Sequence, residues 1–189
     1  AREYDVTYLG YNGDGHFGRL NLTTSFYVAL GEENGAVFTG EDSDIEAYFF
    51  AIEPGIDFDW IRLRGSFLYG SGDDDPFDDK SEGFAAILEN PQFAGADTSY
   101  WIRQGVPLIG GGRVALSQRN AVLPSMLSSK EHGQSNFTSP GIFLLGGGVD
   151  FDILPELRLT FNVNYLEFAE TEVLEVARNQ GNVDEEIGL

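Results

Sequence analysis

The chain has 189 residues, of which 31 are acidic and 11 are basic, and its formal net charge is −20 at pH 7. This balance argues against nucleic acid as a ligand, because phosphate contacts depend on Lys and Arg. The sequence contains no cysteine and no run of 18 apolar residues, which excludes disulfides, thiolate metal sites and a membrane-spanning helix from these residues.

Six segments have the side-chain pattern of β-strands. The clearest is residues 157–165, in which every odd position is apolar or aromatic and every even position is polar. A period of two is typical of a sheet with unlike faces. We predict strands over residues 4–11, 16–30, 43–58, 60–69, 141–153 and 156–168.

The connections between these segments alternate in length. Short turns are expected at residues 12–15, around Asp59 and at Leu154-Pro155, whereas the connections at 31–41 and 70–140 are long. Antiparallel strands that cross a membrane as a barrel give this pattern, with tight turns on one side and large loops on the other.

The same alternation would also suit a soluble sandwich whose two sheets share a core. Strand length favours the barrel, because a tilted membrane strand needs about 9–11 residues and typical globular strands have about 5–6. Phe58 and Trp60 beside one tight turn match an aromatic girdle. We predict an all-β, antiparallel, up-and-down transmembrane β-barrel segment over residues 1–189. The alternative is a soluble, secreted, Ca²⁺-binding β-sandwich that binds glycans.

Closed single-chain bacterial barrels have an even number of strands, eight or more. Six strands are complete in this sequence, and a seventh is expected to begin near residue 184. Remaining strands or further copies of the chain are therefore expected to complete the barrel.

The acidic run at residues 69–84 contains the sequence Ser-Gly-Asp-Asp-Asp-Pro and is followed by Gly83-Phe84. Together with residues 90–95, 128–137 and 162–166, it resembles the alginate-export family of outer-membrane barrels. The resemblance implies a porin-like channel in the bacterial outer membrane, in contact with lipid, whose lumen passes a small polar or charged solute.

Polar side chains on the strands are the candidate lumen residues. They are Arg62, Arg64, Arg158, Glu46, Asn162 and Asn164. Guanidinium groups bind carboxylate and phosphate oxygens in pairs, which suits a route for anionic sugars or organic acids. Internal pairing with Glu46, Asp150 or Asp152 is an equally good interpretation, and a lumen that shares the overall acidity would favour cations instead.

The acidic run itself has enough carboxylates to hold a Ca²⁺ ion, which takes several oxygen ligands. The candidate ligands are Asp73, Asp74, Asp75, Asp78 and Asp79. Their spacing is not that of an EF-hand. A solvated acidic loop with aspartates as turn formers is the favoured interpretation.

Within the long connection, residues 80–89 have a short helical pattern. We predict that the connection forms a cap or plug and that aromatic residues anchor it or narrow the pore. These residues are Phe84, Phe93, Tyr100 and Trp101. His16 and His132 have no triad spacing to a Ser or Asp, so no enzyme activity is predicted.

Overall fold

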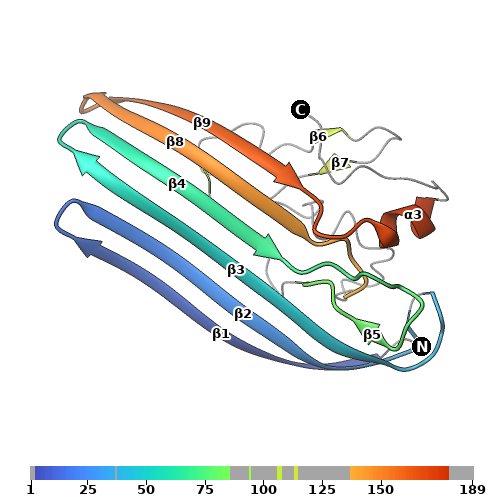
Figure 1. Ribbon diagram of the computed structural model, residues 1–189. Coiled ribbons are helices and arrows are strands. Elements are labelled where there is room, and N and C mark those ends of the chain that lie inside the picture. The colour runs from blue at the N-terminus through green and yellow to red at the C-terminus, as the bar shows by residue number, and fades with distance from the viewer. Residues whose placement is uncertain are drawn as a thin grey trace.

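The computed structural model describes residues 3–36, 38–85, 94, 106–107, 113–114 and 137–178. Six long strands form one antiparallel meander in which each strand pairs with the next (Figure 1). They are β1 (Glu3–Phe17), β2 (Leu20–Asn34), β3 (Ser43–Phe58), β4 (Ile61–Gly70), β8 (Ile142–Leu154) and β9 (Leu157–Glu167). The prediction of an all-β protein with six antiparallel strands is confirmed.

The remaining elements are short. β5 (Lys80–Ser81) pairs in parallel with β3, β6 (Val106–Pro107) pairs with β7 (Arg113–Val114), and α3 (Glu172–Arg178) follows β9. The predicted helix at 80–89 is wrong over its described part, because its first two residues extend the sheet and no helix follows as far as Ala85.

Helices in the described part of the chain are all too short or too polar to cross a membrane.

The tight turns lie together at one end of the sheet, which is the left end in Figure 1. The connections over residues 35–42 and 71–141 leave from the other end. Within the described residues the sheet begins at β1 and ends at β9, and these two edges do not pair with each other. The sheet is therefore open.

The first turn lies beyond its predicted place. β1 continues through residues 12–15, and the chain reverses at Gly18-Arg19. Gly18 has a φ of 66°, which suits the first central position of a type II′ hairpin turn. Asn12 instead bonds across the sheet, where it donates to the Tyr27 hydroxyl and accepts from Ser25 Oγ at 2.9 Å.

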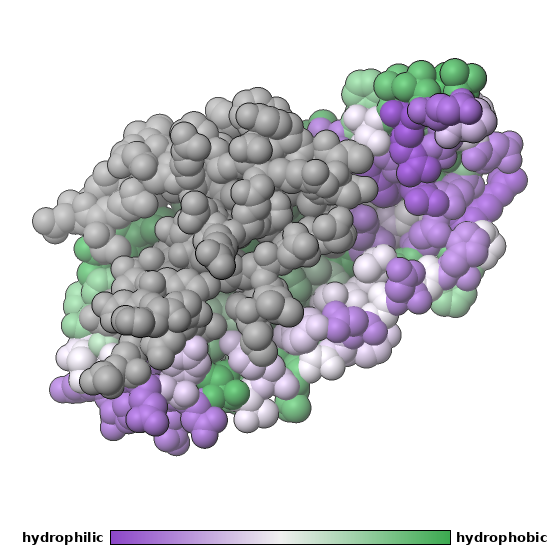
Figure 2. Space-filling model, turned by 180° about the vertical axis from the view of Figure 1, so that it is seen from behind, coloured by the Kyte–Doolittle hydropathy of each residue, from purple (hydrophilic) through white to green (hydrophobic). Residues whose placement is uncertain are grey.

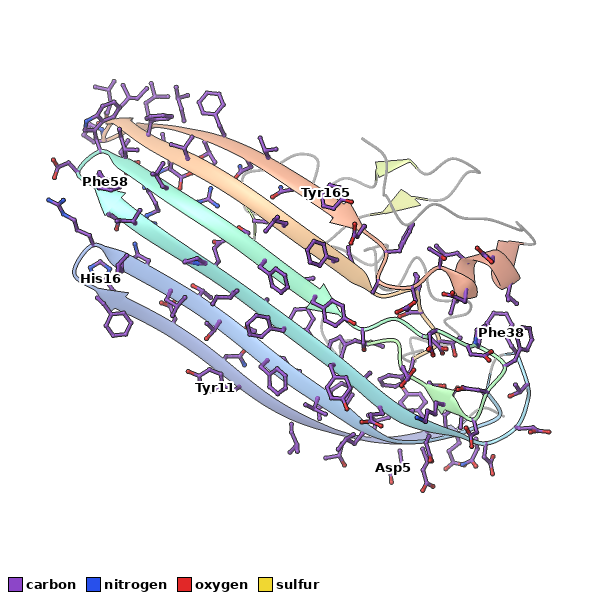
Figure 3. All side chains as sticks on the ribbon, viewed as in Figure 1. Asp5, Tyr11, His16, Phe38, Phe58 and Tyr165 are labelled. Carbon is purple, nitrogen blue, oxygen red and sulfur yellow. The ribbon has the colours of Figure 1, made fainter. Side chains whose placement is uncertain are left out.

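The strand register divides the side chains between two unlike faces. Phe17, Leu20 and Leu63 fall in one transverse row with Phe161, because each strand is paired with the next at these positions. Figure 3 shows the sheet with Tyr11, Phe58 and Tyr165 along it. This apolar face has a large exposed hydrophobic surface, made by Leu9, Tyr11, Phe17, Leu20, Phe26, Leu30, Tyr48, Phe50, Phe58, Leu63, Tyr69, Leu145, Leu159, Phe161, Val163 and Tyr165.

The apolar face stops before the strands do. Near the starts of β1 and β3 and the end of β2, the same face carries Asp5, Glu32 and Asp44 in a row. Like charges that lie directly opposite each other destabilise a sheet unless water screens them. We therefore expect this row to lie in water.

The opposite face, called the covered face below, carries the hydrophobic core at the end of the long connections. Phe84, Ala85 and Phe137 pack there against Ala29 and Ala47. Tyr8 joins them, because its hydroxyl donates to the Ala85 carbonyl at 2.7 Å. The two ends of the 71–141 connection are thereby packed against the first three strands.

We predict that Phe137→Ala lowers the free energy of unfolding by about 3–5 kcal/mol, because the Phe137 ring is fully buried against Tyr4 and Tyr8. Urea titration followed by circular dichroism measures the change. The control is Phe77→Ala, since Phe77 is 59% exposed. Equal losses in the two variants would contradict this account of the core.

Candidate functional site

The three predicted lumen arginines all lie on the covered face towards the tight turns, and each is bound to a carboxylate. Arg62 Nε lies 2.5 Å from Asp57 Oδ1 and its Nη2 lies 3.1 Å from Oδ2. Arg158 binds Asp152 in the same way, at 2.5 and 3.1 Å. Such two-pronged pairs are the strongest that arginine makes.

Arg64 lies at the centre of the group and is the most enclosed. Its Nε and Nη2 donate to the two oxygens of Asp150 at 2.9 and 3.0 Å, and Nη2 also donates to Asn162 Oδ1 at 2.9 Å. Glu53 Oε2 lies 4.0 Å from Nη1. The side chains of Arg64 and Asp150 are only 12% and 11% exposed. The guanidinium thus joins strands β3, β4, β8 and β9.

A second polar chain continues across the first three strands at the same end. His16 Nδ1 lies 2.6 Å from Asn21 Oδ1, and Asn21 Nδ2 donates to Asp57 Oδ2 at 2.9 Å. Figure 3 places His16 at the turn end, and Figure 2, viewed from behind, shows hydrophilic residues gathered there (upper right). His16 is therefore a member of a structural network.

These contacts favour internal pairing over solute binding by the arginines. Asp150 and Asp152 are partners as the pairing interpretation expected, and Asp57 is a partner that sequence reasoning missed. Asp57 lies directly opposite Arg62 in the register, so the strand pairing would have found it. The prediction that Glu46 shares a face with the arginines is wrong, because Glu46 lies on the apolar face with Tyr48, whose hydroxyl donates to it.

Asn164 and Glu53 meet a single residue of the long connection. Ser66 Oγ donates to Glu53 Oε2 at 2.6 Å, and the Ala94 N–H donates to the same oxygen at 2.8 Å. Asn164 Nδ2 donates to the Ala94 carbonyl at 3.4 Å. Asn162 and Asn164 therefore both lie on the covered face, where Asn162 accepts a hydrogen bond from Arg64.

Glycines on β8 make room for these long side chains. A Cβ at Gly148 would lie 2.6 Å from Asn162 Oδ1 and 3.0 Å from Arg64 Nη2. At Gly147, which points to the apolar face, a Cβ would meet only a backbone oxygen at 4.0 Å. The requirement for glycine at position 148 is therefore one of space on the covered face.

Of the predicted constriction residues, Phe84 is buried and stacks on Phe49, with ring centroids 5.2 Å apart. Phe93, Tyr100 and Trp101 lie outside the described residues, as does His132.

The acidic run does not come together as a cation site. Asp75 Oδ1 accepts from the Phe77 N–H at 3.0 Å and Asp78 Oδ1 from the Lys80 N–H at 2.8 Å, which are turn contacts. Asp74 and Asp79 are exposed, and Asp73 is buried. Across the part of the chain that the structure describes, no three His, Cys, Asp or Glu side chains are arranged to hold a metal ion.

Among the carboxyl groups that the structure describes outside the strands, Asp73 has the most strongly shifted pKa. It is 1% exposed, and among the described residues Oδ2 has no hydrogen-bond partner. Burial, with the charges of Asp78, Glu82 and Asp74, raises the pKa of Asp73 to about 8. Its backbone N–H donates to the Ser139 carbonyl at 2.8 Å, so the carboxyl lies where the two ends of the long connection meet.

Comparison of the chain with models of protein families, with curated proteins and with solved structures found no match in any of the three. The chain forms a sheet with one exposed apolar face and an opposite face that carries both the internally paired polar network and the hydrophobic core.

We predict that Gly148→Ala destabilises the sheet by about 1–3 kcal/mol, because the new methyl group displaces Asn162 from Arg64 and leaves polar groups unpaired. Gly147→Ala is the matched control and is expected to change stability much less. The measurement is the urea midpoint of each variant. Equal midpoints for the two variants would refute the spatial argument.

We predict that stability falls as pH rises from about 4 to about 8, and that Asp73→Asn removes this part of the dependence. The reason is that folding raises the pKa of Asp73, so the folded state binds the proton more tightly than the unfolded chain across that window. Urea midpoints of the parent and the variant are compared at each pH, with exposed Asp79→Asn as the control. Parallel curves for parent and Asp73→Asn would contradict the prediction.

Proposed function

We propose that this chain forms part of the wall of a β-barrel in a bacterial outer membrane and that the barrel is a channel for polar solutes. The observation that carries the proposal is the exposed apolar face, on which Val163 is 80% and Phe161 is 59% exposed. Hydrocarbon would remove the cost of wetting such a surface, which is about 25 cal/mol per Å² of apolar area. Apolar patches of this extent mark membrane or protein contacts.

Strand length and the open edges support the same proposal. The shortest long strand, β4, has 10 residues, which fits a tilted membrane crossing of about 9–11. Unpaired strand edges are not stable against lipid. We therefore propose that remaining strands or further copies of the chain pair with β1 and β9 and close the barrel.

The polar end of the covered face would line the lumen. Each of its three arginines binds a carboxylate, and Glu53 and Asp14 add further negative charge on the same face. The ion pairs remove the main argument for an anionic solute. We propose a lumen that prefers neutral or cationic polar solutes, with the connection over residues 70–140 narrowing it at the end where Phe84 packs.

A scaffold role in a larger envelope complex is the second candidate, because the ends of that connection pack against one end of the covered face at Phe84 and Phe137. The soluble sandwich has less support. It requires a second sheet over the apolar face, and beyond the main sheet the described residues form only the two-residue strands β6 and β7. Kinship with the alginate-export family stays a prediction from the sequence.

We predict that Val163→Arg, on the apolar face, reduces folding into liposomes, because an arginine at the bilayer midplane costs about 2–4 kcal/mol. Thr23→Arg places the same group on the covered face and is the control. The folded fraction is read from heat-modifiable gel migration. A parent chain that stays monodisperse in detergent-free buffer, or equal folding of the two variants, would contradict the membrane assignment.

We predict weak cation selectivity in planar bilayers that contain the parent protein. The reversal potential across a KCl gradient measures it, and the acidic excess on the covered face is the reason. Insertion without conductance would favour the scaffold role. An anion-selective current would contradict the proposed lumen.

A further inference from the structure

Four residues form a row across neighbouring strands on the covered face. Ser66 is paired with Gly146, Gly146 is paired with Asn164, and Ser66 Oγ reaches Glu53 on the other side. Ala94 lies on this cross-strand row, although it belongs to the connection between β4 and β8. It is 1% exposed.

Both backbone groups of Ala94 are bound by side chains of the row. Its N–H donates to Glu53 Oε2 at 2.8 Å, and its carbonyl accepts from Asn164 Nδ2 at 3.4 Å. Ala94 has a φ of 53°, in the left-handed region that residues with a side chain rarely adopt. Such a conformation persists where the surroundings hold it in place.

Contacts among the strand residues themselves fix the side chains that bind Ala94. Glu53 Oε2 also accepts from Ser66 Oγ at 2.6 Å and lies 4.0 Å from Arg64 Nη1, which fix the carboxylate. Gly146 leaves space for the neighbouring amide, because a Cβ there would overlap Asn164 Oδ1. An acceptor and a donor are therefore held on either side of one position.

We propose that the cross-strand row is a binding site for a peptide unit and that its ligand is Ala94 of the chain's own connection. The chemistry is complementary, because a carboxylate acceptor meets the N–H and a carboxamide donor meets the carbonyl of the same residue. The site anchors the connection to β3 and β9, away from the contacts of Phe84 and Phe137. This inference requires only the sheet and does not depend on a membrane.

The chain contains no cysteine, so Ala94→Cys introduces a single thiol whose maleimide labelling reports the burial of position 94. We expect labelling at least tenfold slower than in Phe77→Cys, which tests an exposed position. Adding Glu53→Ala or Asn164→Ala is expected to raise the rate at position 94 several-fold. Thr7→Ala removes an exposed polar group from the apolar face, away from the row, and is expected to leave the rate unchanged.

Hydrogen exchange of the Ala94 amide, read by NMR in the chain without cysteine, gives a second measurement that does not depend on the thiol. The amide is expected to exchange at least tenfold more slowly than an unprotected peptide, and Asn164→Ala or Glu53→Ala to remove the protection while the strand amides keep theirs. Fast labelling together with fast exchange in the parent would overturn the proposal, and so would protection that neither substitution changes. Both readouts work in buffer or in detergent, so they remain decisive even if the chain does not insert into membranes.

Discussion

The strict alternation of side chains along paired strands is the constraint on which this structure depends. Because Phe17, Leu20, Leu63 and Phe161 lie in one transverse row, a slip of one residue in any hairpin would place apolar groups among the arginines. The turns at Gly18 and Asp59 hold that register, and each has a positive φ at its first position. The apolar face and the polar network are thus two results of one pairing pattern.

The polar network needs space for long side chains on the covered face, and glycine provides it. Arg64 reaches Asp150 and Asn162 only because Gly148 leaves the neighbouring position empty. Removing one partner of such an enclosed pair leaves an uncompensated charge, which is more damaging than never having formed it. The arginines therefore join β3, β4, β8 and β9, and each guanidinium group is bound to a carboxylate within the sheet.

Periodicity in the sequence was enough to predict six strands, their antiparallel order and the faces of the arginines. It was not enough for the first turn, because residues 12–15 are typical of a turn by composition, whereas Asn12 uses its amide across the sheet. Glu46 was misplaced where the aromatic run at residues 48–50 hides the alternation. The Asp57 pairing depends on register, and the contact between Glu53 and Ala94 joins residues 41 positions apart, which no local pattern records.

The strands differ in length, so they end at different levels at the end of the sheet opposite the tight turns. β1 has 15 residues and β4 has 10, and the extra part of β1 to β3 carries the row Asp5, Glu32 and Asp44 on the side that is otherwise apolar. In the proposed orientation, the ends of these three strands extend beyond the bilayer into water. The Phe84 and Phe137 cluster lies on the covered face of this extension. The protein groups that hold Phe84 and Phe137 would then stand clear of the lipid, so a substitution in this cluster would leave the membrane-immersed part of the wall undisturbed.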